Sequence, residues 1–323
     1  VTAVNVVFMG TPDFAVDTLK AIEQAGHHIS LVITQPDKQK GRGKKVLYTP
    51  VKEAALEAGM EVMQPEKVKD PVVLERLTEL APDVIVVVAY GQILPESILK
   101  LPKYGCINVH ASLLPKYRGA APIQWAVING EKVSGVTTMY MAKGLDTGDM
   151  IERVEVELSP EETGGSLHDK LARAGAELLV STLDKLEKGT ARRIPQNDAE
   201  SCYASMLEKS LGNICWEDPA EKIERLIRGL SPWPSAYTYL NGKTLKLWNV
   251  TIVKEDALPE GALKEQPAGT ILYVDKKCFL IQTGQDCLRV NEMQLEGKKR
   301  MLTDAFLRGY HLEAGTKLEN ERA

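Results

Sequence analysis

Two polar side chains near residue 110 have the types and the spacing that carbonyl chemistry needs. Asn108 and His110 end a short β-branched run, residues 106–110. Because alternate residues of a strand project to the same side, an amide and a titratable imidazole would lie next to each other. Such a pair could polarise a carbonyl and stabilise the oxyanion that forms when a nucleophile attacks it. The alternative is a polar strand end whose side chains hydrogen-bond to neighbouring loops, and strand geometry alone leaves both interpretations open.

An aspartate on a turn bracketed by glycines is the next candidate. Asp146 lies between Gly144 and Gly148, shortly after a predicted strand. Its carboxylate could orient His110 or take a proton during a reaction. It could equally hydrogen-bond to the backbone of its own turn, as aspartate often does. Asp149 is a nearby competitor for the catalytic role, and the sequence does not separate the two carboxylates.

The elements that must position these residues alternate between strands and helices over the first part of the chain. β-Branched runs predict strands at residues 4–9, 29–34, 84–89, 106–110 and 136–141, with 150–158 as an edge strand. Helical patterns predict helices at residues 14–25, 51–58, 72–80, 121–129 and 165–186. This alternation indicates an α/β domain with a Rossmann-like, mostly parallel sheet. Such sheets bind ligands beyond the carboxyl ends of their strands, although no G-x-G-x-x-G follows the first strand here.

The pattern changes after Lys188. Residues 189–207 are polar and interrupted by Pro195, which predicts a linker on the surface. Short strands are then predicted at residues 236–240, 244–252, 269–274, 278–283 and 288–294. This pattern is typical of a small barrel or sandwich, and of these we expect an OB-like β-barrel. The expected organisation is a catalytic domain of residues 1–188, the linker, and a C-terminal domain of residues 208–323.

Composition places the chain among ordinary globular proteins. Of its 323 residues 44% are hydrophobic and 26% charged, which argues against disorder and against a fibrous fold. We expect no membrane span and no secretory signal, since no apolar run is long enough. The five cysteines form no C-x-x-C pair, so we expect no metal site and a cytoplasmic location. The net charge of −4 argues against nucleic acid for the chain as a whole, but not for a local segment.

The two polar motifs together resemble those of the formyl-tetrahydrofolate-dependent transferases. The family pattern N-x-H-x-S-L-L-P is matched from Asn108 to Pro115, and G-x-D-x-G is matched from Gly144 to Gly148. The resemblance implies that Asn108, His110 and Asp146 are catalytic and that 10-formyltetrahydrofolate donates the formyl group. The folate-binding residues that it implies are Ser112, Leu113, Leu114, Pro115, Tyr90 and Gly91.

A basic segment at residues 38–45 bears on the formyl acceptor. It carries five cations and no acid, and two glycines allow close approach of its backbone. By itself it could be a solvated surface loop, but it follows the second predicted strand and so lies near the ligand-binding edge. It resembles the tRNA-contacting insertion of family members that formylate methionyl-tRNA. The residues expected to bind tRNA are Lys38, Lys40, Arg42, Lys44 and Lys45.

The resemblance therefore implies formyl transfer to the α-amino group of methionine on initiator methionyl-tRNA, as a step of translation initiation. We expect a monomer whose C-terminal barrel helps to hold the tRNA. One alternative is formylation of an amino-sugar nucleotide by the same folate chemistry. Another is a non-catalytic protein that binds tRNA or folate. The intact set of Asn108, His110 and Asp146 favours an enzyme, because binding alone does not need all three.

Overall fold

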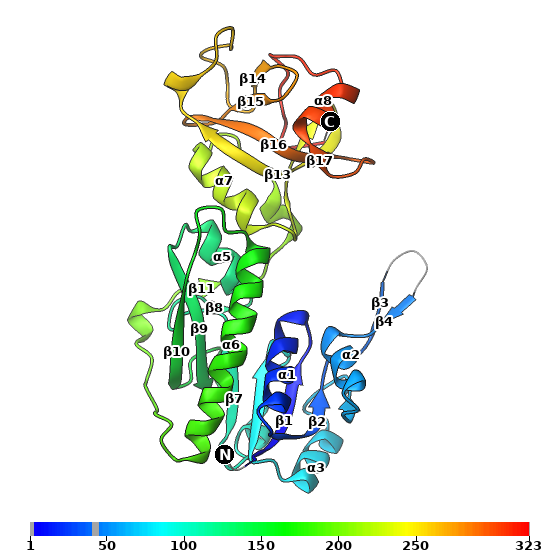
Figure 1. The fold of residues 1–323 in the computed structure, drawn as a ribbon, viewed down its shortest axis with the longest axis vertical. Coiled ribbons are helices and arrows are strands. Elements are labelled where there is room, and N and C mark those ends of the chain that lie inside the picture. Colours follow the sequence, from blue (N-terminus) through cyan, green and yellow to red (C-terminus); the bar gives the residue numbers. More distant parts are fainter. Residues whose placement is uncertain (1–2, 41–44, 323) are drawn as a thin grey trace. The chain divides into compact units, whose positions relative to one another are not determined.

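The computed structural model describes residues 3–40 and 45–322, which divide into two compact units (Figure 1). The first unit comprises the chain up to Pro122 and the segments Val133–Glu157 and His168–Ala204. The second comprises Ile123–Lys132, Leu158–Leu167 and the chain from Ser205 onward. Most of the segment predicted as a linker, residues 189–204, is thus assigned to the first unit. None of the helices in the described part of the chain combines the length and apolar character needed to cross a membrane.

A seven-stranded sheet forms the centre of the first unit, in the order β10-β9-β7-β6-β1-β2-β5 (Figure 1). The pairs from β5 through to β7 are parallel, and β9 and β10 add to the sheet antiparallel. This confirms the α/β class with a mostly parallel sheet. The strands are β1 (Asn5–Gly10), β2 (His28–Ile33), β5 (Val62–Met63), β6 (Val84–Val88), β7 (Cys106–His110), β9 (Val133–Tyr140) and β10 (Met150–Glu157).

Helices cover both faces of this sheet. Those in or entering the first unit are α1 (Val16–Gln24), α2 (Pro50–Glu57), α3 (Pro71–Leu80), α4 (Glu96–Leu99) and α6 (Gly164–Glu187). The starts of α2 and α3 follow local rules, because Thr49 and Asp70 cap them and a proline occupies the first turn of each. Val73 and Leu77 of α3 share a buried apolar cluster with the sheet residues Val7 and Ile85.

The alternation of side chains along β7 decides which face carries the polar residues. Cys106 faces α4, with its Sγ 3.6 Å from the carbonyl oxygen of Ile98. Val109 faces α6 at Gly175, where an added Cβ would lie 3.0 Å from a Val109 methyl group. Asn108 and His110 therefore project to the same side as Cys106, away from α6. Burial raises the pKa of the Cys106 thiol to about 12.

Several short elements were not predicted, because pairing with distant segments creates them. A hairpin of β3 (Lys38–Lys40) and β4 (Lys45–Leu47) flanks the centre of the basic segment, where a loop was expected. Arg42 and Lys44 lie outside the described residues. Two-residue strands, β8 (Arg118–Gly119) and β11 (Tyr203–Ala204), pair in parallel although they are far apart in the chain.

The second unit contains an antiparallel sheet in the order β12-β13-β16-β15-β14, with β17 paired to β16. Residues 317–319 extend it between its edges, because Glu319 bridges to Tyr239 of β12 and Lys317 bridges to Thr270 beside β14. These pairings form the predicted small β-barrel. The elements are α5 (Pro122–Ile128), α7 (Ala220–Gly229), β12 (Ala236–Leu240), β13 (Lys243–Val253), β14 (Ile271–Val274), β15 (Phe279–Gln282), β16 (Cys287–Leu295), β17 (Met301–Leu302) and α8 (Thr303–Gly309).

The core of the barrel gives a stability prediction. Leu288 is fully buried, whereas Leu302 is 61% exposed. We expect Leu288→Ala to lower the free energy of unfolding of this unit by about 2–5 kcal/mol, and Leu302→Ala to change it by less than about 0.5 kcal/mol. All four tryptophans belong to the second unit, so urea unfolding followed by tryptophan fluorescence measures it. Equal losses in the two variants would contradict the assigned core.

Candidate active site

The side-chain amide of Asn108 has an acceptor without a partner. Its Nδ2 donates to the Val87 carbonyl oxygen at 3.2 Å. Because that carbonyl can only accept, the contact sets the orientation of the amide. The Oδ1 atom is buried and has no hydrogen-bond partner among the described residues. Buried polar atoms are almost always paired, so Asn108 Oδ1 has the property expected of a group that binds a ligand.

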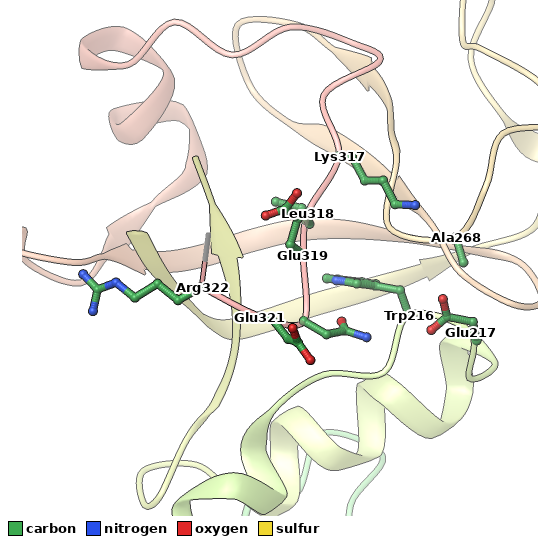
Figure 2. A pocket seen from close by; sticks show the side chains of 9 residues that line it. Trp216, Glu217, Ala268, Lys317, Leu318, Glu319, Glu321 and Arg322 are labelled. Carbon is green, nitrogen blue, oxygen red and sulfur yellow. The ribbon is translucent and has the colours of Figure 1, made fainter. Parts of the chain in front are cut away.

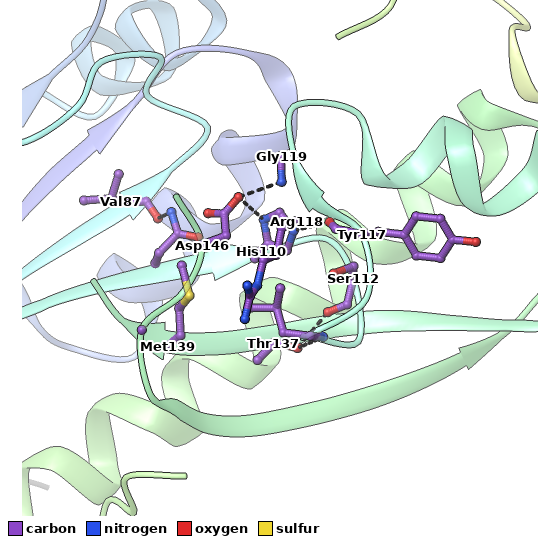
Figure 3. A network of polar contacts seen from close by, with 12 residues as sticks. Val87, His110, Ser112, Tyr117, Arg118, Gly119, Thr137, Met139 and Asp146 are labelled. Atoms are coloured by element: carbon purple, nitrogen blue, oxygen red, sulfur yellow. Dashed lines mark hydrogen bonds and ion pairs between the residues drawn. The ribbon is translucent and has the colours of Figure 1, made fainter. Parts of the chain in front are cut away.

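His110 is held in one orientation by the backbone. Its Nε2 lies 2.8 Å from the Tyr117 carbonyl oxygen, and only 7% of the residue is exposed. The carbonyl accepts, so the Nε2 atom carries the proton in the neutral ring and the Nδ1 lone pair is free. Nδ1 lies 3.8 Å from Asp146 Oδ2, close enough for ion pairing if that nitrogen is protonated (Figure 3). The Tyr117 carbonyl oxygen therefore fixes the ring, and Asp146 faces its other nitrogen, Nδ1.

The turn that carries Asp146 has little conformational freedom. Asp146 itself has a φ of +53°, in the left-handed region that costs a non-glycine residue about 1–3 kcal/mol. At Gly148 an added Cβ would lie 1.6 Å from the Tyr140 carbonyl oxygen, so only glycine fits there. Asp146 Oδ2 accepts a hydrogen bond from the Gly119 amide at 2.8 Å (Figure 3). The competing carboxylate, Asp149, pairs instead with Arg193 at 3.5 Å, so the structure brings Asp146 and not Asp149 to His110.

The segment after β7 is buried and polar contacts connect it to β9. Ser112 is 1% exposed, and its hydroxyl donates to the Lys116 carbonyl oxygen at 2.6 Å. Thr137 Oγ1 donates to the Ser112 carbonyl and accepts from the Leu114 amide (Figure 3). Leu114 and Pro115 are buried and joined by a cis peptide bond, while Leu113 is half-buried. This segment follows His110 directly in the chain, and its role in binding folate stays a prediction.

The other predicted folate-binding turn follows β6. Ala89 and Gly91 both have positive φ angles, +47° and +95°. The carbonyl oxygen of Tyr90 between them accepts hydrogen bonds from the side chains of Thr11 and Gln35. The Tyr90 ring is buried, which raises the pKa of its hydroxyl to about 12. This turn, at the carboxyl end of β6, borders the strand end that carries His110, because β6 and β7 are neighbours in the sheet.

Sequence reasoning missed residues that hold this site together. Tyr117 and Gly119 act through their backbone, and Gln196 comes from the segment predicted as a linker. Gln196 Nε2 donates to the carbonyl oxygens of Asp146 and Gly148, both at 2.8 Å. Any residue type can make a hydrogen bond through its backbone, so the sequence gives no sign of the contacts made by Tyr117 and Gly119. For Gln196, the only signal was a polar residue beside Pro195, which is too common to single out.

The base of the basic segment is held by a charged contact. Asp37 Oδ2 lies 2.7 Å from the Lys52 ammonium, and its Oδ1 accepts from Gln64 Nε2 at 2.8 Å. Lys52 also lies over the ring of Tyr48, 3.7 Å from its centroid. The hydrogen bond from Lys52, and then that from Gln64, hold the pKa of the Asp37 carboxyl below its ordinary value. Lys38 is exposed next to this anchor.

A separate hollow of about 520 Å³ lies in the second unit (Figure 2). Trp216 forms one wall, and side chains of both charge signs surround it, including Lys317, Glu319 and Arg322. It contains no imidazole beside an amide. No group of three or more His, Cys, Asp or Glu residues in the described part of the chain is arranged to hold a metal ion. The arrangement suited to carbonyl chemistry is the one around His110.

Two family models match the chain in line with this site and fold. The model described as formyl transferase matches residues 4–183, and the model described as formyl transferase, C-terminal domain, matches residues 206–311. The chain belongs to the formyl transferase family.

Curated relatives indicate which kind of formyl transferase this chain is similar to. The methionyl-tRNA formyltransferase of Agathobacter rectalis is 57% identical over 97% of this chain and 98% of its own length. That of Lachnospira eligens is 55% identical over 97% of this chain and 99% of its own length. At this identity and coverage, the chain is an enzyme of the same type as these relatives.

Solved structures share the fold at low sequence identity. An N-formyltransferase from Helicobacter canadensis, in complex with folinic acid and dTDP-3-aminofucose, gives a TM-score of 0.65 at 19% identity, covering 90% of this chain and 99% of that one. HypX from Aquifex aeolicus, in complex with tetrahydrofolic acid, gives a TM-score of 0.63 at 17% identity, covering 95% of this chain and 47% of that one. They support the two-part architecture.

The anchor of the basic segment gives a titration prediction. We expect Lys52→Met to raise the pKa of Asp37 toward its ordinary value, because the strongest hydrogen bond to the carboxylate is lost. In the wild type, the stabilisation from Asp37 is present above that ordinary pKa, about 3.9, and is lost as pH falls through the lower folded value. Carboxyl-resolved NMR measures the shift. The control Lys100→Met, which removes a partner of Glu96, should leave Asp37 unchanged.

Proposed function

We propose that this chain transfers the formyl group of 10-formyltetrahydrofolate to the α-amino group of methionine on initiator methionyl-tRNA. The observation that carries this proposal is the strand end at which Asn108 has an unpartnered buried oxygen and His110 faces Asp146. Membership of the family and the names of the relatives support the reaction and the acceptor. The folates bound in the structural neighbours support the class of donor.

The reaction needs a held oxyanion and an exit for one proton. The amine nitrogen attacks the formyl carbon, and the formyl oxygen becomes an oxyanion. The bond from carbon to the folate N10 then breaks, and N10 takes a proton while the new amide nitrogen loses one. An α-amino group has a pKa of about 7.7–8.0, so a useful neutral fraction exists near neutral pH.

The Asn108 amide can hydrogen-bond to both reacting groups, the formyl oxyanion and the attacking amine. One Nδ2 hydrogen is taken by the Val87 carbonyl oxygen, and the other is free to donate to the oxyanion. The Oδ1 atom can accept a hydrogen bond from the attacking amine. Both atoms are held before substrate binds, so little reorganisation is needed during the reaction.

His110 and Asp146 handle charge and the proton. The Tyr117 carbonyl oxygen keeps the Nε2 proton in place, so Nδ1 is the nitrogen that exchanges a proton. The Asp146 carboxylate at 3.8 Å is placed to stabilise a proton on Nδ1. This separation is longer than a hydrogen bond, and such contacts often shorten only when substrate is bound. Asp146 thereby orients His110 and helps to move the proton.

The folate is proposed to bind between two turns at this edge of the sheet. Ser112, Leu113, Leu114 and Pro115 would form one wall, and Tyr90 and Gly91 the other. The basic segment, comprising Lys38, Lys40, Arg42, Lys44 and Lys45, would contact phosphates of the tRNA acceptor stem. The C-terminal barrel would add further tRNA contacts.

Substitution of Asn108 and of His110 tests the catalytic assignment. Asn108→Ala should lower kcat by about 10²–10³-fold, the usual loss for one oxyanion donor. His110→Ala should lower it by about 10²–10⁴-fold, the usual contribution of a side chain that transfers a proton. The assay supplies 10-formyltetrahydrofolate with methionyl initiator tRNA, and in a parallel reaction a UDP-amino sugar, and measures the formylated product. Activity of either variant within about threefold of wild type would remove that residue from the mechanism. A product formed only on the sugar would refute the acceptor.

A charge-matched pair of variants tests the basic segment. Arg42→Ala should raise KM for methionyl-tRNA and make the salt dependence of tRNA affinity shallower by somewhat less than one unit of log–log slope, because one phosphate contact is lost. Folate binding should not change. Arg192→Ala removes the same charge from an exposed site outside the basic segment and should match wild type. An unchanged KM and salt slope in Arg42→Ala would contradict the proposed contact.

A further inference from the structure

Four of the hydrogen bonds of the Gln196 side chain connect the Asp146 turn to Arg118, a distant part of the chain. Its Nε2 donates to the carbonyl oxygens of Asp146 and Gly148, each at 2.8 Å. Its Oε1 accepts from Arg118 Nε at 3.1 Å and from Arg118 Nη2 at 2.9 Å. All four contacts are made by the side chain of one half-buried residue, which lies 48 to 50 positions from the two carbonyl groups and 78 positions from Arg118.

These partners allow only one orientation of the Gln196 amide. Backbone carbonyls accept and cannot donate, while a guanidinium donates and cannot accept. A flipped amide would set its oxygen against two carbonyl oxygens and its NH₂ group against Arg118. The contact is therefore selective for an amide, and no other side chain of similar length offers both functions at this position.

The backbone on both sides of Gln196 is anchored to the same unit. Ile194 exchanges two backbone hydrogen bonds with Met150, at 2.8 and 2.9 Å, next to the start of β10. Further along, the Cys202 carbonyl oxygen accepts from the Arg118 amide at 2.9 Å. Gln196 is thus presented by a fixed segment, so its side chain can restrain the turn.

Arg118 connects this contact back to the Asp146 carboxylate. The next residue, Gly119, donates its amide to Asp146 Oδ2 at 2.8 Å. Asp146 is therefore held from two sides, at its side chain by Gly119 and at its main chain by Gln196. Because its φ is +53°, the turn is strained and requires such restraint to persist.

We propose that Gln196 is a positioning residue for formyl transfer, which acts by holding the main chain of the Asp146 turn so that the carboxylate faces His110 Nδ1. The inference rests on the proposed roles of Asp146 and His110. Gln196 itself touches no substrate. Its effect should fall on the chemical step, because a displacement of about 1 Å in a catalytic group can cost about 10²-fold in rate.

Two substitutions separate positioning from simple anchoring. Gln196→Glu retains an acceptor for Arg118, and adds a charge that favours this pairing, but it removes the donors to the two carbonyls. Gln196→Ala removes these four hydrogen bonds and also the 4.0 Å contact of Nε2 with Met139 Sδ. If Gln196 positions Asp146, both variants should lose about 10²-fold in kcat for formylmethionyl-tRNA formation, with KM for methionyl-tRNA unchanged. If it only anchors Arg118, the glutamate variant should retain wild-type kcat, and that result would overturn the proposal.

Asp198 offers a matched control. Its carboxylate pairs with the same arginine at 2.7 Å, but its side chain is 83% exposed. Asp198→Asn should keep wild-type kcat and KM, because an exposed ion pair contributes little. A loss as large as that of Gln196→Glu would show that Arg118 pairing matters and would count against the proposal.

A double-mutant cycle protects the test against loss of folding. In the Asp146→Asn background, Gln196→Ala should cause little further loss of kcat, since both changes disable the same group. Full multiplication of the two effects would contradict positioning through Asp146. Circular dichroism melting of each variant reports folding independently.

A preliminary assay of the wild type separates this proposal from the proposed function. The wild type is given methionyl-tRNA and, in a parallel reaction, the amino-sugar nucleotide. Formylation of the sugar alone would refute the proposed acceptor, but the effects of the Gln196 variants could still be measured on that substrate.

Discussion

The carboxylate of Asp146 is the group around which the polar contacts of the candidate site are arranged. A charged group that is largely shielded from water needs donors, and this one obtains them from segments far apart in the chain. The Gly119 amide donates to it, and the imidazole of His110 lies beside it. The short pairing of β8 with β11 presents that amide, and at Gly119 an added Cβ would lie 2.5 Å from the ring of Tyr203. The local backbone is therefore built around one carboxylate.

The candidate site also contains a buried polar atom that has no hydrogen-bond partner among the described residues, Asn108 Oδ1. Leaving Asn108 Oδ1 buried without a partner costs stability, of the order of 1–3 kcal/mol for such a group. In the proposed function a substrate amine would supply the missing donor. The strand that carries Asn108 lies inside a sheet covered on both faces, and the half-buried Asn108 side chain keeps its Oδ1 atom shielded from water. In the proposed function, the rigid strand β7 and the restrained Asp146 turn have the same effect. Both keep the site arranged before the substrate binds.

The net charge belongs to the whole chain, whereas the proposed binding of tRNA depends on one short segment. The net charge of −4 describes the whole chain and its behaviour in solution. The proposed contact with tRNA depends on a single segment of about eight residues, whose base is held by Asp37, Lys52 and Gln64. A mildly acidic enzyme can therefore act on a nucleic acid, because counterion release depends on the few cations that meet phosphates and not on the total.

The sequence by itself determined the two-part architecture, the strands of the sheet and the polar residues of the strand end. Those features follow from local rules: β-branched runs, caps such as Thr49, and alternation along β7 that places Asn108 beside His110. Tertiary structure alone decided the rest. It placed Asp146, which the family motif had already indicated, beside His110 and paired Asp149 with Arg193. It also gave His110 a carbonyl partner in Tyr117 and brought Gln196 from a presumed linker to the Asp146 turn. Those choices depend on contacts between residues far apart in the chain, many of them through backbone atoms, and backbone atoms are the same for nearly every residue type.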